Sequence, residues 1–196
     1  LRNFTLEPFE IYLSYLGIRD KYKIEVNYSD FDNAFQNILD GTILKGAKLS
    51  FYFFSLEHSL KGFPYKYISS SVQEIKKLED ELVEEIARNI RLFRQKSDIP
   101  LVIFLPSTSP TIPTNLLGET KNKLNISSSI YERIISEMVD LKNIYFEDIA
   151  RLTLRFGEVK TLEKERKFTT SSLYNLDGLG AITTQSYRYI RTIMGG

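Results

Sequence analysis

The stretch Ser71 to Leu105, SVQEIKKLEDELVEEIARNIRLFRQKSDIPLVIFL, joins a long amphipathic pattern to a short apolar run. Apolar residues recur at spacings of three and four, which predicts a helix from Ser71 to Lys96. Pro100 to Leu105 is apolar almost throughout and predicts a buried strand of the kind that parallel sheets use. The spacing also permits a coiled-coil seam, but a crossover helix lying on a sheet is the commoner explanation. The helical stripe consists of Ile75, Leu78, Leu82, Ile86, Ile90 and Phe93.

The rest of the chain repeats this alternation of helix and strand. Asp30 is expected to cap one helix, and glycines are expected to end three of them, at Gly17, Gly41 and Gly157. We therefore expect an α/β fold, a three-layer α/β/α sandwich with a mainly parallel sheet, and a further strand directly before Leu1. Other strands are predicted at Lys23 to Tyr28, Leu49 to Leu56 and Ile144 to Phe146. Other helices are predicted at Leu6 to Leu16, Phe31 to Leu39, Ser128 to Leu141, Glu147 to Phe156 and Ala181 to Met194.

Composition limits the classes of function. The 26 basic and 25 acidic side chains nearly balance, so neither nucleic acid nor a membrane is an expected partner. The chain has no cysteine, which excludes disulfides and thiolate catalysis. We expect a cytoplasmic protein, because no apolar run approaches a membrane span and no signal peptide is visible. The 196 residues suit a single domain, residues 1–196, and the start at Leu1 suggests a fragment or N-terminal domain of a longer chain.

Polar residues gather after the predicted strands, where ligand sites of parallel sheets lie. His58 is the sole histidine and stands between Glu57 and Ser59, so any imidazole base must be His58. A solitary exposed or core-edge histidine is the more frequent situation. Five acidic residues match neither a calcium loop nor a zinc site and are read as helix caps or solvated positions; we expect no metal and no cofactor. They are Asp30, Asp32, Asp40, Glu147 and Asp148.

The tail Leu176 to Ile190, LDGLGAITTQSYRYI, resembles the end of SGNH (GDSL-type) hydrolases, in which an Asp-x-x-His turn opens the last helix. The resemblance implies a flavodoxin-like topology and makes Asp177 the triad acid, with Gly180 in the place of the histidine. At the head of the chain, Asn3 or Phe4 occupies the nucleophile position, and Thr5 is the nearest hydroxyl. A triad that lacks nucleophile and base is expected to retain little acyl-transfer activity.

Within this superfamily the chain looks closest to the N-terminal SGNH-like domain of FkbH-like proteins. The stretches that carry this resemblance are Asn3 to Pro8, Tyr28 to Asp40, Phe146 to Leu152 and Tyr187 to Ile190. In such proteins a haloacid-dehalogenase-like (HAD-like) domain follows and is associated with loading a glyceryl unit onto an acyl carrier protein. The resemblance therefore implies two partners, an acyl carrier protein and an adjacent HAD-like catalytic domain.

Several candidate residues have two interpretations each. Asp177 is either a remnant triad acid or the N-cap of the last helix, and Thr5 with Asn3 is either a helix cap or part of a site. The hydroxyl-rich loop that begins at Ser107 either lines a pocket or is an ordinary proline-rich connection. The predicted ligand-binding residues are Asn3, Ser29, Glu57, Ser107 and Gly180.

The most favoured function is a non-hydrolytic accessory or binding domain beside a catalytic partner domain. The first alternative is an active ester hydrolase or O-acyltransferase with a rebuilt site formed by Thr5, His58 and Asp177. A third interpretation is a module that binds carbohydrate or acyl groups.

Overall fold

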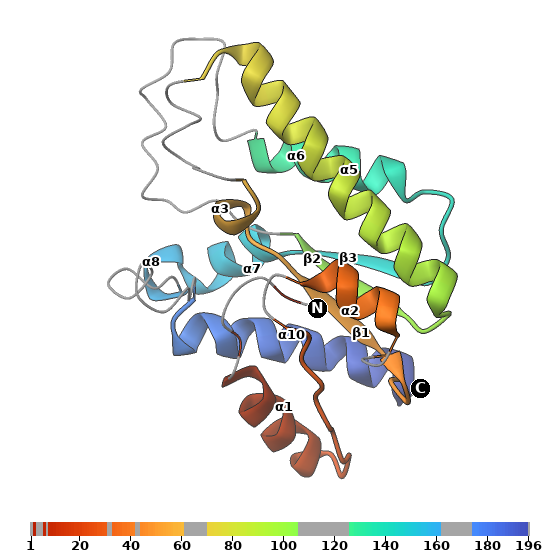
Figure 1. The fold of residues 1–196 in the computed structure, drawn as a ribbon. Coiled ribbons are helices and arrows are strands. Elements are labelled where there is room, and N and C mark those ends of the chain that lie inside the picture. The colour runs from red at the N-terminus through yellow and green to blue at the C-terminus, as the bar shows by residue number, and fades with distance from the viewer. Residues whose placement is uncertain are drawn as a thin grey trace.

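The computed structural model describes residues 2, 6, 8–30, 33–41, 44–60, 70–105, 126–161 and 174–195. These residues form a parallel sheet in the order β1-β2-β3, made of β1 (Ser50–Phe53), β2 (Leu101–Leu105) and β3 (Ile144–Asp148). Helices cover both faces of the sheet (Figure 1), which confirms the predicted α/β/α layering. The helices are α1 (Pro8–Arg19), α2 (Ala34–Asp40), α3 (Leu56–Ser59), α5 (Val72–Lys96), α6 (Ile126–Glu137), α7 (Ile149–Phe156), α8 (Glu158–Thr161) and α10 (Leu176–Met194).

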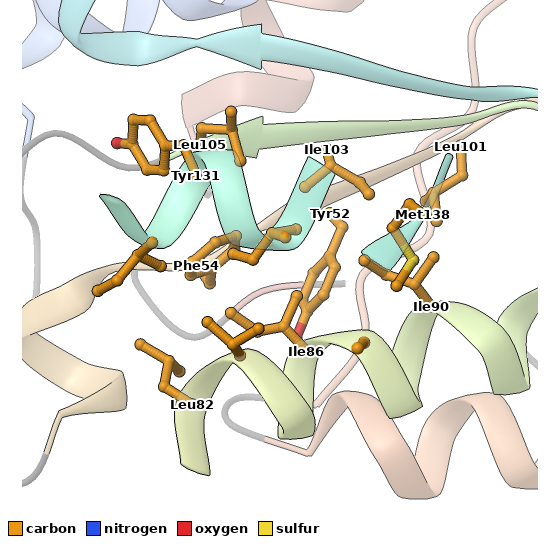
Figure 2. Close-up of a cluster of buried hydrophobic side chains, with 14 of the residues drawn as sticks. Tyr52, Phe54, Leu82, Ile86, Ile90, Leu101, Ile103, Leu105, Tyr131 and Met138 are labelled. Carbon is orange, nitrogen blue, oxygen red and sulfur yellow. The ribbon is translucent and has the colours of Figure 1, made fainter. Parts of the chain in front are cut away.

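Side chains of the sheet alternate between two hydrophobic clusters, one on each face, as the pleat requires. On the first face, Tyr52 and Ile103 pack with α2, α5 and α6 (Figure 2). On the second face, Phe53 and Phe104 stack with ring centroids 4.4 Å apart, and Phe9 of α1 meets Phe53 edge-on at 5.4 Å. Helices α1, α7 and α10 complete this second cluster. All five residues of β2 are buried, because the central strand is covered on both faces.

The long helix α5 is as the sequence predicts, from its cap at Ser71 to Lys96. Ser71 and Glu74 form a reciprocal capping box: the Glu74 N–H donates to the Ser71 hydroxyl at 3.3 Å, and the Ser71 N–H donates to the Glu74 carboxylate at 2.7 Å. The apolar stripe of α5 lies against the sheet and α6, so α5 is a crossover helix and the coiled-coil interpretation is wrong.

The prediction that Gly17 ends the first helix is wrong. Helix α1 begins at Pro8 and continues through Gly17 to Arg19. A Cβ at position 17 would lie 2.9 Å from the carbonyl oxygen of Tyr22, so the glycine allows the following chain to pass close to the helix. The glycine is needed for this close approach of the backbone, and the spacing of apolar residues along the sequence does not reveal such a contact.

Two further predictions near the N-terminus are wrong. Residues 23–28 are not a strand of the sheet that the described residues form. Asp30 does not cap α2, because the residue before this helix is Asn33; Asp30 instead accepts a hydrogen bond from the Asn37 side chain at 3.3 Å. By contrast, the end of α2 at Gly41 is confirmed, and the left-handed φ of 68° explains the glycine there.

The last helix begins five residues earlier than predicted, at Leu176 instead of Ala181. Its N-cap is Asn175, whose side-chain oxygen accepts from the Gly178 N–H at 3.0 Å. Asn175 also donates through its amide to the Lys160 carbonyl at 2.7 Å and through its backbone to the Thr161 carbonyl at 3.1 Å. The segment after Gly157 begins with α8, whose last residue, Thr161, is fully buried. Contact with α8 therefore sets where α10 starts.

Candidate functional site

The candidate site lies at the carboxyl edge of the sheet. Helix α3 follows β1 closely and α7 follows β3 directly, with Asp148 as the N-cap of α7 through a hydrogen bond from the Arg151 N–H at 3.3 Å. Helix α10 runs antiparallel to the strands, since its last turn shares a groove with the start of β1 while Gln185 bonds to Glu147 near the end of β3. Its first turn therefore projects past the edge where parallel strands place their ligand sites.

Asp177 is exposed in the first turn of α10. It lies eight residues before Gln185, about 12 Å along the helix axis. Because Asn175 caps the helix, the N-cap interpretation of Asp177 is wrong. The carboxylate is thus not needed to start α10, and its role as a remnant triad acid stays a prediction.

Gly180 lies almost one turn after Asp177, on the same side of the helix. A Cβ built at Gly180 would meet nothing within 4 Å. Packing therefore does not require a glycine at this position, and the helix has room for a side chain. What position 180 lacks is an imidazole, the group that the Asp-x-x-His pattern places there.

Ser29 is buried, with 2% of its surface exposed. Its hydroxyl accepts a hydrogen bond from the Arg2 N–H at 3.2 Å, and the Arg2 guanidinium lies 4.6 Å from the centre of the Tyr28 ring. These contacts attach the N-terminal segment to the chain that follows α1. The hydroxyl thus has a structural contact, while its predicted part in ligand binding is not tested.

The remaining predicted site residues lie outside what the structure describes. These are Asn3, Thr5 and Ser107, together with the side chains of Glu57 and His58. The backbone of Glu57 and His58 belongs to α3, immediately beyond β1. The convergence of Thr5, His58 and Asp177 in one pocket therefore stays a prediction.

A polar cluster between β3 and α10 was not predicted from the sequence. Glu147, interpreted as a cap or a solvated residue, instead accepts hydrogen bonds from the Tyr189 hydroxyl at 3.0 Å and the Gln185 amide at 2.8 Å. Burial raises the pKa of the Tyr189 phenol, and the charge of Glu147 raises that pKa further. The four-residue spacing of Gln185 and Tyr189 was the available signal, since it puts two polar groups on one side of the helix. The cluster connects α10 to the sheet.

The residues that the structure describes offer neither a metal-binding cluster nor a membrane-spanning helix. Within those residues, no cluster of three or more His, Cys, Asp or Glu side chains is arranged to hold a metal ion. In the same residues, no helix is both long enough and apolar enough to span a bilayer.

Comparison with known proteins identifies a similar fold. No protein-family model matches the chain, and no curated protein sequence matches it. A crystal structure of the N-terminal part of the protein BF1531 from Bacteroides fragilis, which contains a phosphatase domain complexed with Mg, superposes with a TM-score of 0.76 at 14% sequence identity. The superposition covers 99% of this chain and 51% of the other, so this chain spans about half the length of that solved protein. At this identity the likeness shows a shared fold.

Proposed function

We propose that this chain is a non-hydrolytic accessory domain of an FkbH-like protein, in which it stands beside a phosphatase-like domain of the HAD type. Two features support the proposal. The chain resembles FkbH-like N-terminal domains in four stretches of sequence, and its fold is similar to about half of a solved protein that also contains a phosphatase domain. In this arrangement the partner domain performs the chemistry, and this domain positions an acyl or glyceryl carrier for it.

The observation that carries the non-hydrolytic part is Gly180. Asp177, on the exposed first turn of α10, stands where the SGNH resemblance puts the triad acid, yet the residue three positions later has no side chain although space is open there. An acid without its imidazole cannot activate a hydroxyl nucleophile. Because packing does not demand the glycine, the missing base is a change of chemistry and not a consequence of crowding.

The test is hydrolysis of short-chain p-nitrophenyl esters by the protein and by its Thr5→Ala, His58→Ala and Gly180→His variants. We expect background rates for all four, because an imidazole restored at position 180 still lacks a serine to activate. Gly180→Ala is the matched control for the helical effect of replacing the glycine. Clear turnover by the parent protein that Thr5→Ala or His58→Ala abolishes would overturn the proposal in favour of a hydrolase or acyltransferase with a rebuilt site.

The carrier role is tested separately, by titrating an acyl carrier protein, in its apo and in its phosphopantetheinylated form, into this chain and following binding calorimetrically. We expect saturable binding that persists in Thr5→Ala and His58→Ala, because carrier recognition does not need the acyl-transfer residues. Absence of binding to both the apo and the phosphopantetheinylated carrier would contradict carrier positioning.

A further inference from the structure

Helix α1 carries large apolar side chains on the side that faces away from the sheet. Its inner side packs into the second hydrophobic cluster through Phe9 and Leu13. On its outer side, Ile11, Tyr15 and Ile18 are 73%, 68% and 76% exposed. Their spacings of four and three residues place these three side chains in one line along the helix, and we call them the outer stripe. In Figure 1 α1 lies at the lower boundary of the fold.

The outer stripe differs from what the neighbouring helix exposes. Helix α10 packs beside α1, and its exposed positions include Thr184, Arg188 and Arg191. The charged residues of α1 are Glu10 and Arg19, one near each end of the helix, and neither belongs to the outer stripe. A helix that is apolar on all sides is normally covered on all sides. We therefore expect another surface to cover the outer stripe.

The outer stripe is complementary to a second copy of itself. Tyr15 lies between the two isoleucines, about 6 Å along the helix axis from Ile11 and about 4.5 Å from Ile18. When two copies of α1 pair antiparallel, Tyr15 faces the partner's Tyr15, and Ile11 faces the partner's Ile18. A twofold interface needs such a self-complementary patch. The stripe brings no like charges together, and a net charge of +1 causes little repulsion between whole copies.

The area of the outer stripe sets the strength of such a dimer. At about 200 Å² for a fully exposed large side chain, these three exposures amount to roughly 400–450 Å² per copy. A contiguous apolar patch of this size is typical of an interaction site. Two copies would together bury roughly 900 Å², less than the 1,200 Å² or so at which stable interfaces begin. We therefore expect a weak dimer, monomeric at about 10 µM and largely paired near about 1 mM.

We propose that the outer stripe of α1 is a self-association surface, on which two copies of this chain pair through antiparallel α1 helices about a twofold axis at Tyr15. Ile11 and Ile18 of each copy form the two ends of the contact. This inference does not rest on the proposed function, since it uses neither Asp177 nor Gly180. Its failure would leave the accessory role untouched.

Sedimentation equilibrium from about 10 µM to about 1 mM tests the association. We expect the average mass of the parent protein to rise from that of one chain toward that of two. Ile18→Glu, which places a charge in the outer stripe, should stay monomeric throughout. Val139→Glu is the matched control and should associate like the parent, because Val139 is 87% exposed but lies outside α1. An unchanged Tm at low concentration shows that both variants fold.

Two results of this experiment would overturn the proposal. A parent protein that stays monomeric at every concentration would assign the outer stripe to a different protein partner. Association that persists in Ile18→Glu would place the contact between copies on another surface.

Single cysteines test the antiparallel arrangement, because the chain has no cysteine of its own. Tyr15→Cys should form disulfide-linked dimers under mild oxidation, since position 15 faces its own copy. Ile11→Cys should not, because the two copies of position 11 lie about 12 Å apart along the axis, beyond the roughly 7 Å between Cα atoms that a disulfide spans. A mixture of Ile11→Cys and Ile18→Cys should cross-link. Efficient cross-linking of Ile11→Cys with itself, or equal cross-linking of Tyr15→Cys and Val139→Cys, would contradict the proposed pairing.

Discussion

At the scale of single residues, Gly178 and Gly180 lie on the same turn of α10 but differ in how tightly their surroundings pack. A Cβ at Gly178 would overlap the carbonyl oxygen of Thr161 and lie 3.0 Å from its carbonyl carbon and 3.1 Å from the Cβ of Tyr174. A Cβ at Gly180 would meet nothing within 4 Å. The contact of α8 with α10 therefore excludes a side chain at one position, while the other position is left open by packing.

We predict that Gly178→Ala lowers the free energy of unfolding by about 1–3 kcal/mol, the usual cost of forcing extra atoms into packed structure. Gly180→Ala should raise the free energy of unfolding by about 0.5–1 kcal/mol, because alanine loses less backbone freedom than glycine in a helix. Urea denaturation of the two variants beside the parent protein measures both changes. Equal effects of the two substitutions would contradict the close approach of α8 to Gly178.

At the scale of elements, the crossover helix α5 depends on its first turn. At its start, the capping box engages the amides of Ser71 and Glu74. At its other end, Arg94 in the last turn binds the chain that leaves the helix. The Arg94 guanidinium donates to the carbonyls of Ser97 at 2.9 Å and Ile99 at 3.0 Å, which directs the chain into β2. Both ends are thus held by side chains that belong to α5 or its cap.

We predict that Ser71→Ala lowers the free energy of unfolding by about 1 kcal/mol, the typical cost of losing an N-cap. The matched control is Ser136→Ala on α6, where the serine hydroxyl donates to the Glu132 carbonyl within an exposed helix turn and caps nothing. The control should leave stability nearly unchanged. A chemical denaturation series on both variants checks the prediction, and an equal loss in the two would argue against the capping box.

At the scale of the whole molecule, a partly buried polar contact holds the last helix to the edge of the sheet. Tyr189 donates to Glu147, and burial is the main reason that the pKa of Tyr189 is raised above its ordinary value of 10.0. Because the folded protein holds this proton more tightly than the unfolded chain, the contribution of Tyr189 to stability is complete below about pH 10 and is lost as the pH rises above it.

We predict that the free energy of unfolding falls as the pH rises above about 10, and that Tyr189→Phe makes this fall shallower. Tyr15→Phe is the control, since Tyr15 is 68% exposed on α1. Thermal unfolding measured from pH 8 to about pH 11.5 tests the prediction. An identical pH dependence in the parent protein and Tyr189→Phe would refute a role for this phenol.

Local patterns in the sequence determined the layered α/β class and the extent of α5. They succeeded because helical period, strand composition and caps such as Ser71 and Asp148 act over a few residues. The ends of α2 at Gly41 and of α7 before Gly157 were predictable for the same reason.

Tertiary structure alone decided the features that depend on distant neighbours. Position 17 requires a glycine because the Tyr22 carbonyl passes beside the helix there, and α10 starts at Leu176 because Asn175 bonds to the end of α8. Glu147 faces α10 instead of solvent because Gln185 and Tyr189 reach it from another layer. The contacts of Asn175 and Glu147 join segments that are far apart in sequence, and the spacing of residues along one segment does not reveal what packs against it.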